Sequence, residues 1–406
     1  MAAAKIGGEL LGRWGQPPVL GELLIGVVLG NLGLAGFTYL EPLRDSETLR
    51  VVAEIGAILL LFEVGVESDL MQLLAVGWSS LVVAILGVVA PMILGYVVSV
   101  QLMPDASWLT HLFVGGTLTA TSVGITARVL KDLHRAHTKE ARIILGAAVA
   151  DDVIGLVVLA VVSGLVTAAA ASGNASVSVL SVLWIVAKAV VFLGAAVWIG
   201  RFAAQRMFLY AARLKVAGAL LAVCMCFCFL TAAAAAAVGL APIVGAFAAG
   251  VVLEEVHYKP FRERGERKVE ELLQPITTLV VPVFFVLMGI RVDLRSFASL
   301  PVISFALLIT AVSIIGKQIC GLGVLEKGVD RIIVGVGMIP RGEVGLIFAG
   351  LGAGLMLQGK PVLSQTTFSA LVLMVMLTTF ITPPLLKMVF EKRKPIQHHS
   401  HASAAV

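Results

Sequence analysis

Long apolar runs fill most of this chain and limit what it can fold into. Of its 406 residues, 59% are hydrophobic and 14% are charged, and the mean hydropathy is +1.01. An α-helix needs about 20 apolar residues to cross roughly 30 Å of hydrocarbon. A soluble domain could not carry this composition, so the sequence predicts an all-α, polytopic membrane protein. Besides a stub at residues 1–12, we count twelve runs, at residues 18–34, 49–66, 74–102, 109–133, 141–170, 177–204, 216–238, 240–256, 274–292, 299–324, 330–354 and 365–391.

Basic residues gather in alternate loops between these runs. Cytoplasmic loops of membrane proteins carry the excess of Lys and Arg. With the stub counted as the first helix, we therefore expect the N-terminus outside and the C-terminus in the cytoplasm. The same topology accounts for the formal net charge of +5, so we expect no nucleic-acid partner. The basic loops are residues 128–142, 201–215, 259–268 and 392–394, whereas the opposite side holds almost only Arg44, Arg50, Arg291, Arg295 and Lys360.

Two segments of the chain repeat at one spacing. Residues 18–30, PVLGELLIGVVLG, match residues 242–254, PIVGAFAAGVVLE, at an offset of 224. The offset pairs the second helix with the ninth and the third with the tenth. Units seven helices apart run in opposite directions, so the sequence predicts an inverted repeat, as in many secondary transporters. The stub then matches the eighth helix and reads as the end of a truncated first helix. The aligned glycine pairs are Gly21 with Gly245, Gly26 with Gly250, and Gly65 with Gly289.

Three charged residues lie inside the apolar runs. Asp151 and Asp152 are in ILGAAVADDVIGLVVLA, and Lys317 is in TAVSIIGKQICGLG. Each such charge costs roughly 2.5–3.5 kcal/mol at the centre of a membrane helix, so a functional site is the default interpretation. Adjacent helical residues point about 100° apart, so one carboxylate can meet the lysine while the other faces a water-filled cavity. A purely structural ion pair would explain one aspartate with Lys317 but not the second.

Two further runs are interrupted by polar residues, glycine and proline. Residues 117–130 read TLTATSVGITARVL, and residues 335–348 read GVGMIPRGEVGLIF. Broken helices are tolerated at membrane depth where they line a cavity, and they mark transporter binding sites. We expect oxygens near Thr121 and Ser122 to complete a sodium shell, and Arg341 and Glu343 to neutralise the half-helix ends. The alternative is that Arg341 and Glu343 form an ion pair that only closes the break.

With ADD, TATSVGITARVL, IIGKQICG and PRGEVGLI, the chain resembles the NapA-type bacterial sodium/proton antiporters of the second monovalent cation:proton antiporter superfamily. The resemblance extends from about Gly12 to Phe390 and implies a thirteen-helix inverted-repeat antiporter fold. It implies a core that carries its ion by an elevator-like movement against a scaffold that forms a homodimer. The implied parts are a scaffold at residues 1–72 and 216–296, a core at 73–175 and 297–391, a linker helix at 176–215 and a cytoplasmic tail at 392–406.

The same resemblance assigns roles to the site residues. Asp152 is similar to the essential ion-binding carboxylate, Asp151 to the partner of Lys317, and Thr121 and Ser122 to the residues at the helix crossing. Asp152, Asp151 and Thr121 would bind the transported Na⁺. The intact aspartate pair is similar to that of electrogenic members. The resemblance implies no cofactor beyond the transported Na⁺ and H⁺, and it implies a place among the lipids of a bacterial inner membrane.

Two other functions remain open from the sequence. A potassium/proton exchanger or a potassium efflux system of the same superfamily would carry similar residues, so sodium, lithium and potassium are not distinguished. An intramembrane aspartyl protease also needs two membrane carboxylates. Such proteases take them from different helices, whereas Asp151 and Asp152 are adjacent. We therefore expect a transporter rather than an enzyme.

Overall fold

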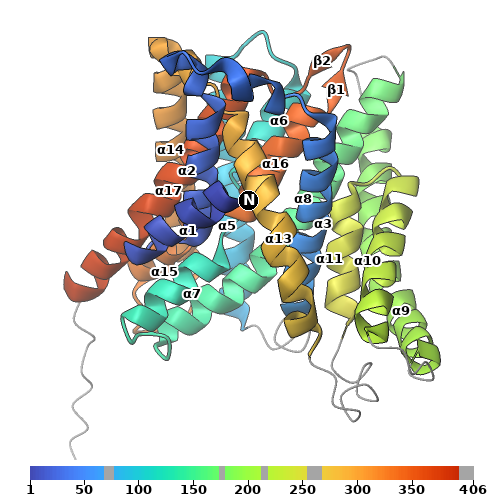
Figure 1. Cartoon of the computed structure of the whole chain (residues 1–406). Coiled ribbons are helices and arrows are strands. Elements are labelled where there is room, and N and C mark those ends of the chain that lie inside the picture. Colours follow the sequence, from blue (N-terminus) through green and yellow to red (C-terminus); the bar gives the residue numbers. More distant parts are fainter. Residues whose placement is uncertain (68–76, 173–178, 212–217, 254–267, 393–406) are drawn as a thin grey trace, which may run out of the picture.

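Helices make up nearly all of the structure, a computed structural model that describes residues 1–67, 77–172, 179–211, 218–253 and 268–392. Beyond short 3₁₀ turns, the one other regular element described is a hairpin of β1 (Met356–Leu357) and β2 (Lys360–Pro361). The predicted tail lies outside the described residues except for Lys392. The helices, shown in Figure 1, are α1 (Ala2–Arg13), α2 (Pro18–Gly30), α3 (Glu47–Glu67), α5 (Trp78–Leu102), α6 (Trp108–Thr117), α7 (Val123–Asp132), α8 (Lys139–Ser172), α9 (Val179–Ala211), α10 (Ala219–Ala237), α11 (Pro242–Val252), α13 (Val269–Ile290), α14 (Leu300–Cys320), α15 (Arg331–Gly337), α16 (Glu343–Gly354) and α17 (Gln365–Lys392).

Seven described helices are long and apolar enough to cross a membrane: α5, α8, α9, α10, α13, α14 and α17. The shorter helices α2, α11 and α16 are also apolar. These lengths and compositions confirm the predicted all-α, polytopic membrane fold. The exact number of thirteen membrane helices stays a prediction.

Several helix ends differ from the apolar runs. The run at 18–34 is helical only to Gly30 and continues as a 3₁₀ turn, Leu32–Ala35. The run at 274–292 begins as a helix five residues early, at Val269, because Glu270 and Glu271 occupy its first turn. Acidic side chains favour a helix N-terminus, where they interact with the positive end of the dipole. Hydropathy alone therefore misplaces this start.

The two interrupted runs are each broken into two helices, as predicted. Residues 109–133 form α6 and α7, and residues 330–354 form α15 and α16. In the second run, Pro340 has no backbone N–H to donate, which favours ending a helix. Gly342 follows with φ −139° and ψ −138°, outside helical geometry. We call the two non-helical stretches, residues 118–122 and 338–342, the crossing.

The contacts among four helices are related by the 224-residue offset of the sequence repeat. In the four-helix cluster of α2, α3, α11 and α13, α3 packs against α11 and α13, and α13 packs against α2. A Cβ added to Gly26 would lie 3.0 Å from the Cα of Gly289, and one added to Gly65 would lie 3.0 Å from the Cα of Gly250. The repeat offset of 224 converts the first contact into the second. Equivalent glycines thus make equivalent contacts, as an inverted repeat requires.

The first helices of the two repeats, α1 and α10, also make equivalent contacts. Gly21 of α2 meets the backbone of Gly7 in α1, and Gly245 of α11 meets the backbone of Thr231 in α10. Residues 7 and 231 are again 224 positions apart. The stub therefore packs on α2 as α10 packs on α11, in agreement with its match to the eighth helix.

The remaining helices position the charged residues. Helix α5 packs against α6, α8 and α14, and α17 packs against α7, α14, α15 and α16. Helix α9 contacts α8 on one side and α10 and α11 on the other. In Figure 1, α9 and α10 lie at one edge of the molecule and α14 and α17 at the opposite edge.

Candidate functional site

Asp151 and Lys317 form a buried ion pair between α8 and α14. The Lys317 Nζ donates a hydrogen bond of 3.1 Å to the Asp151 Oδ1, and both side chains are 0% exposed. The Asp151 Oδ2 is also buried and has no hydrogen-bond partner among the described residues. Removing one partner of a buried pair leaves an uncompensated charge and typically costs 3–5 kcal/mol. Each residue therefore compensates the buried charge of the other.

Asp152 is the next residue along α8 but has different surroundings. Its side chain is partly exposed, and no described residue donates a hydrogen bond to it. The nearby charges are those of Asp151 and Glu343, which repel its negative charge, and that of Lys317, which attracts it. Of the two adjacent carboxylates, Asp151 is therefore paired with the lysine, and Asp152 has no hydrogen-bond donor among the described residues.

Backbone and hydroxyl groups tie the two halves of the crossing together. The Ser122 N–H donates to the Pro340 carbonyl oxygen at 2.8 Å, and the Thr121 hydroxyl lies 3.5 Å from the Met338 carbonyl oxygen. The Thr126 hydroxyl donates to the Gly337 carbonyl oxygen at 2.6 Å. Thr121 and Ser122 are 2% and 3% exposed. The structure thus places both predicted crossing residues against the other broken helix.

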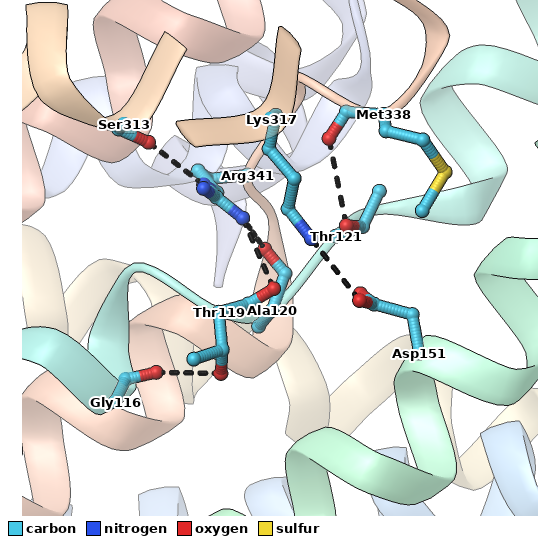
Figure 2. A network of polar contacts seen from close by, with 9 residues as sticks. All are labelled: Gly116, Thr119, Ala120, Thr121, Asp151, Ser313, Lys317, Met338 and Arg341. Atoms are coloured by element: carbon cyan, nitrogen blue, oxygen red, sulfur yellow. Dashed lines mark hydrogen bonds and ion pairs between the residues drawn. The ribbon is translucent and has the colours of Figure 1, made fainter. Parts of the chain in front are cut away.

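Arg341 is fully buried and points into the first half of the crossing, as Figure 2 shows. Its Nη1 donates to the carbonyl oxygens of Thr119 and Ala120, and its Nε donates to the Ser313 hydroxyl at 3.0 Å. These carbonyls follow the end of α6, where the helix dipole is negative and carbonyls lack intrahelical partners. Arg341 therefore satisfies the broken end of α6 with a positive charge.

The alternative of an ion pair between Arg341 and Glu343 is wrong. The Arg341 guanidinium bonds to Ser313 and to backbone carbonyls, and its Nη2 has no partner among the described residues. The Glu343 Oε2 instead accepts from the Ser122 hydroxyl at 3.4 Å. Glu343 is the first residue of α16, where a carboxylate complements the positive end of the dipole. Each charged residue thus serves a different helix end.

A cavity of about 250 Å³ reaches the crossing from the start of α2. Pro17, Pro18 and Arg128 line it on one side, and Ser122, Arg341 and Glu343 line it at the crossing. Asp151, Asp152 and Lys317 do not form its lining. The cavity therefore reaches the crossing but not the aspartate pair.

Sequence reasoning missed two residues that hold Arg341. Ser313 lies four residues before Lys317 in α14, so both face the same side of that helix. This spacing could have revealed it. Thr379 of α17 donates its hydroxyl to the Arg341 carbonyl oxygen. A lone threonine in an apolar helix gives no signal of this kind, because its hydroxyl ordinarily bonds within its own helix.

A helical membrane protein with buried carboxylates beside two broken helices belongs to the class of secondary ion transporters. Comparison with known proteins agrees. Residues 1–392 match the family model described as sodium/hydrogen exchanger, transmembrane, so the chain belongs to the sodium/hydrogen exchanger family. The prediction of a transporter rather than an enzyme is confirmed, and the aspartyl protease alternative is set aside.

Two curated relatives and one solved structure define this relationship. The high-affinity Na⁺/H⁺ antiporter NhaS3 of Synechocystis is 37% identical over 97% of this chain and 88% of its own. The Na⁺/H⁺-K⁺ antiporter GerN of Bacillus cereus is 35% identical over 96% of this chain and 94% of its own. The sodium proton antiporter MjNhaP1 of Methanocaldococcus jannaschii shares the fold, with a TM-score of 0.65 at 14% identity over 96% of this chain and 94% of its own.

Proposed function

We propose that this protein exchanges Na⁺ for H⁺ across a bacterial inner membrane, with Asp152 as the carboxylate that holds either ion. The observation that carries the proposal is the fully buried Lys317–Asp151 pair, which leaves the neighbouring Asp152 without a hydrogen-bond donor among the described residues. A carboxylate that is partly shielded from bulk water accepts a proton more readily than a fully exposed one and can also bind a small cation. Competition for one carboxylate couples the two ions without further machinery.

Asp151, Lys317 and Thr121 would complete the site. Lys317 holds Asp151 in place while no cation is bound. An arriving Na⁺ repels the Lys317 ammonium, which frees Asp151 to share the cation with Asp152. The Thr121 hydroxyl lies at the crossing, 3.5 Å from the Met338 carbonyl oxygen, so it is held weakly enough to turn toward the ion.

Two charged residues at the crossing would balance the helix ends while the site exchanges a proton for a cation. Arg341 neutralises the negative end of α6, and Glu343 complements the positive end of α16. Both charges also act on the aspartate pair, because Glu343 repels Asp152 and Arg341 attracts Asp151. This balance supports a site in which small changes of charge control ion release.

The cavity beside Ser122 and Glu343 would be the cytoplasmic entrance. It includes Arg128 of α7, which begins one of the basic segments expected on the cytoplasmic side. This orientation puts the N-terminus outside and the C-terminus inside. In the proposed cycle, the core at 73–175 and 297–391 moves against the scaffold at 1–72 and 216–296, which forms the homodimer, with residues 176–215 as the linker.

We propose sodium as the first substrate because NhaS3 is named a Na⁺/H⁺ antiporter. The second candidate is potassium, since GerN is named a Na⁺/H⁺-K⁺ antiporter and is nearly as similar. The intact pair of aspartates with Lys317 supports electrogenic exchange, in which more protons than cations move in each cycle.

The test uses purified protein in proteoliposomes with an imposed pH gradient. Sodium, lithium and potassium are added in turn, and dissipation of the gradient is recorded for the wild type and for Asp152→Asn. We expect dissipation by sodium in the wild type and none in Asp152→Asn. A response to potassium alone would assign the protein to potassium/proton exchange, and normal exchange by Asp152→Asn would reject the proposed site.

A further inference from the structure

The buried ion pair has a third neighbour besides α8 and α14. Helix α5 packs against both of them. Beside the pair, α5 carries Gly87. A Cβ added there would lie 3.3 Å from the Lys317 Nζ and 3.6 Å from the Asp151 Oδ1. A contact of 3.3 Å is tighter than most Cβ contacts in proteins, so any side chain at this position would press on the lysine head.

The neighbouring turn fixes the distance between the two helices. A Cβ added to Gly316, the residue before Lys317, would lie 2.8 Å from the Cα of Pro91 in α5. The backbones of α5 and α14 are therefore already in contact one turn away from Gly87. The helices cannot separate at Gly87 without losing this contact. The space beside the Lys317 ammonium consequently depends on the absence of a side chain at residue 87.

Lys317 needs such space if its ammonium moves. Its side chain is 0% exposed, and among the described residues it donates one hydrogen bond, to the Asp151 Oδ1. A fully buried side chain can leave its partner only by entering unfilled volume, because protein interiors are close-packed. The adjacent Cys320 is also 0% exposed and lies within 3.6 Å of the same position. Gly87, Asp151 and Cys320 therefore all lie beside the lysine head, and of these three only Gly87 has no side chain.

We propose that Gly87 is a positioning residue for ion exchange: because it has no side chain, the Lys317 ammonium is not crowded and can shift when Asp151 releases it. The inference rests on the proposed function, since that function requires Asp151 to exchange its lysine for a cation. A competing structural role would be that Gly87 serves only the packing of α5 against its neighbours. The two roles predict different results when Lys317 is shortened.

The first experiment is a double-mutant cycle on thermal stability of the purified protein. It compares Gly87→Ala, Lys317→Ala and the double variant with the wild type. We expect Gly87→Ala to lower the melting temperature when Lys317 is present and to have no such effect when it is alanine. An equal lowering in both backgrounds would overturn the proposal, because the added methyl would then clash with the helices rather than with the lysine.

The second experiment measures exchange in proteoliposomes. We expect Gly87→Ala to lower the maximal exchange rate severalfold with little change in KM for sodium, because the cation site is intact but the lysine is restricted. Gly194→Ala is the control, since a Cβ at Gly194 in α9 would meet nothing within 4 Å. Wild-type exchange by Gly87→Ala would overturn the proposal.

These two experiments separate the inference from the function beneath it. If the wild type exchanges no monovalent cation, the proposed function fails, and the transport role of Gly87 fails with it. The stability cycle would still decide whether Gly87 accommodates the Lys317 head. If the wild type exchanges sodium but the effects of Gly87→Ala and Lys317→Ala on the melting temperature are additive, only the inference about Gly87 fails.

Discussion

The four-helix cluster and the crossing both bring backbone close to backbone, but they do so by different means. In the cluster, glycines let helices touch directly, as at Gly65 and Gly250. At the crossing, the freed backbone groups are satisfied by side chains, as by Arg341 at the carbonyls of Thr119 and Ala120. The first arrangement resists any change of side chain. The second depends on charge and can respond when an ion binds.

The cluster and the crossing therefore separate close backbone packing from the charged groups of the site. Glycine contacts hold the cluster at one fixed spacing, because there is no side chain to adjust. The three charged side chains that are 0% exposed, Asp151, Lys317 and Arg341, lie on α8, α14 or the crossing, whereas Glu22, which is 6% exposed, lies on α2 of the cluster. We therefore expect substitutions in the cluster to affect folding and substitutions at the crossing to affect transport.

The largest expected effect is the loss of the fold in Gly250→Leu. A Cβ at Gly250 would lie 2.7 Å from the Val66 nitrogen and 2.8 Å from the Gly65 carbonyl carbon, so α3 and α11 would have to separate. The cost should reach or exceed the roughly 1–3 kcal/mol typical of overpacking. Size-exclusion chromatography in detergent should show little monodisperse protein. Gly194→Leu is the control. A wild-type yield of monodisperse Gly250→Leu protein would contradict the role of direct backbone contact in the cluster.

The next effect is expected at Arg341. Arg341→Ala leaves the Thr119 and Ala120 carbonyls without their donor, at about 1–3 kcal/mol for each buried group left unpaired. We expect a lower melting temperature and a large loss of exchange. Arg341→Lys should recover part of the exchange, because lysine keeps the charge but not the planar fork. Arg13→Ala, at an exposed side chain of α1, is the matched control.

An Arg341→Ala variant with normal stability and normal exchange would contradict this role. It would mean that solvent or neighbouring hydroxyls satisfy the end of α6 without a cation. The crossing would then resemble the cluster in depending on shape rather than on charge.

A smaller effect on exchange is expected for Asp151→Asn. The amide keeps the shape of the side chain but removes the charge that holds Lys317, so exchange should continue at a reduced rate. Its dependence on an imposed membrane potential should weaken, because the pair no longer takes part in charge movement. The measurement is exchange in proteoliposomes with and without a potassium diffusion potential. Asp105→Asn, at an exposed loop, is the control, and an unchanged voltage dependence would argue against electrogenic use of the pair.

The two broken helices and the site at the three membrane charges were predictable, because a charge or a helix break is costly inside a membrane. Asp151, Asp152 and Lys317 stand out against apolar neighbours, and Pro340 and Gly342 stand out within a helix. The 224-residue offset was likewise visible, since the glycines at its contacts have little freedom to vary. These features were predictable because physical cost limits where they can occur.

Other features could not be predicted from the sequence. Two adjacent aspartates differ by about 100° around the helix, so spacing alone does not decide which one faces Lys317, and the correct choice of Asp151 came from the family resemblance. The direction of Arg341 was equally open, since Glu343 is near in sequence but the Thr119 carbonyl is near in space. Gly87 gave no signal, because one glycine among 41 carries no information until its neighbours are placed.

The most direct test of the central claim is the sodium dependence of exchange measured at several pH values. If Na⁺ and H⁺ compete for Asp152, the KM for sodium rises as the pH falls, while the maximal exchange rate at saturating sodium stays nearly constant. A KM that is independent of pH, with a maximal rate that falls at low pH, would contradict the account. The proton and the cation would then bind at separate sites.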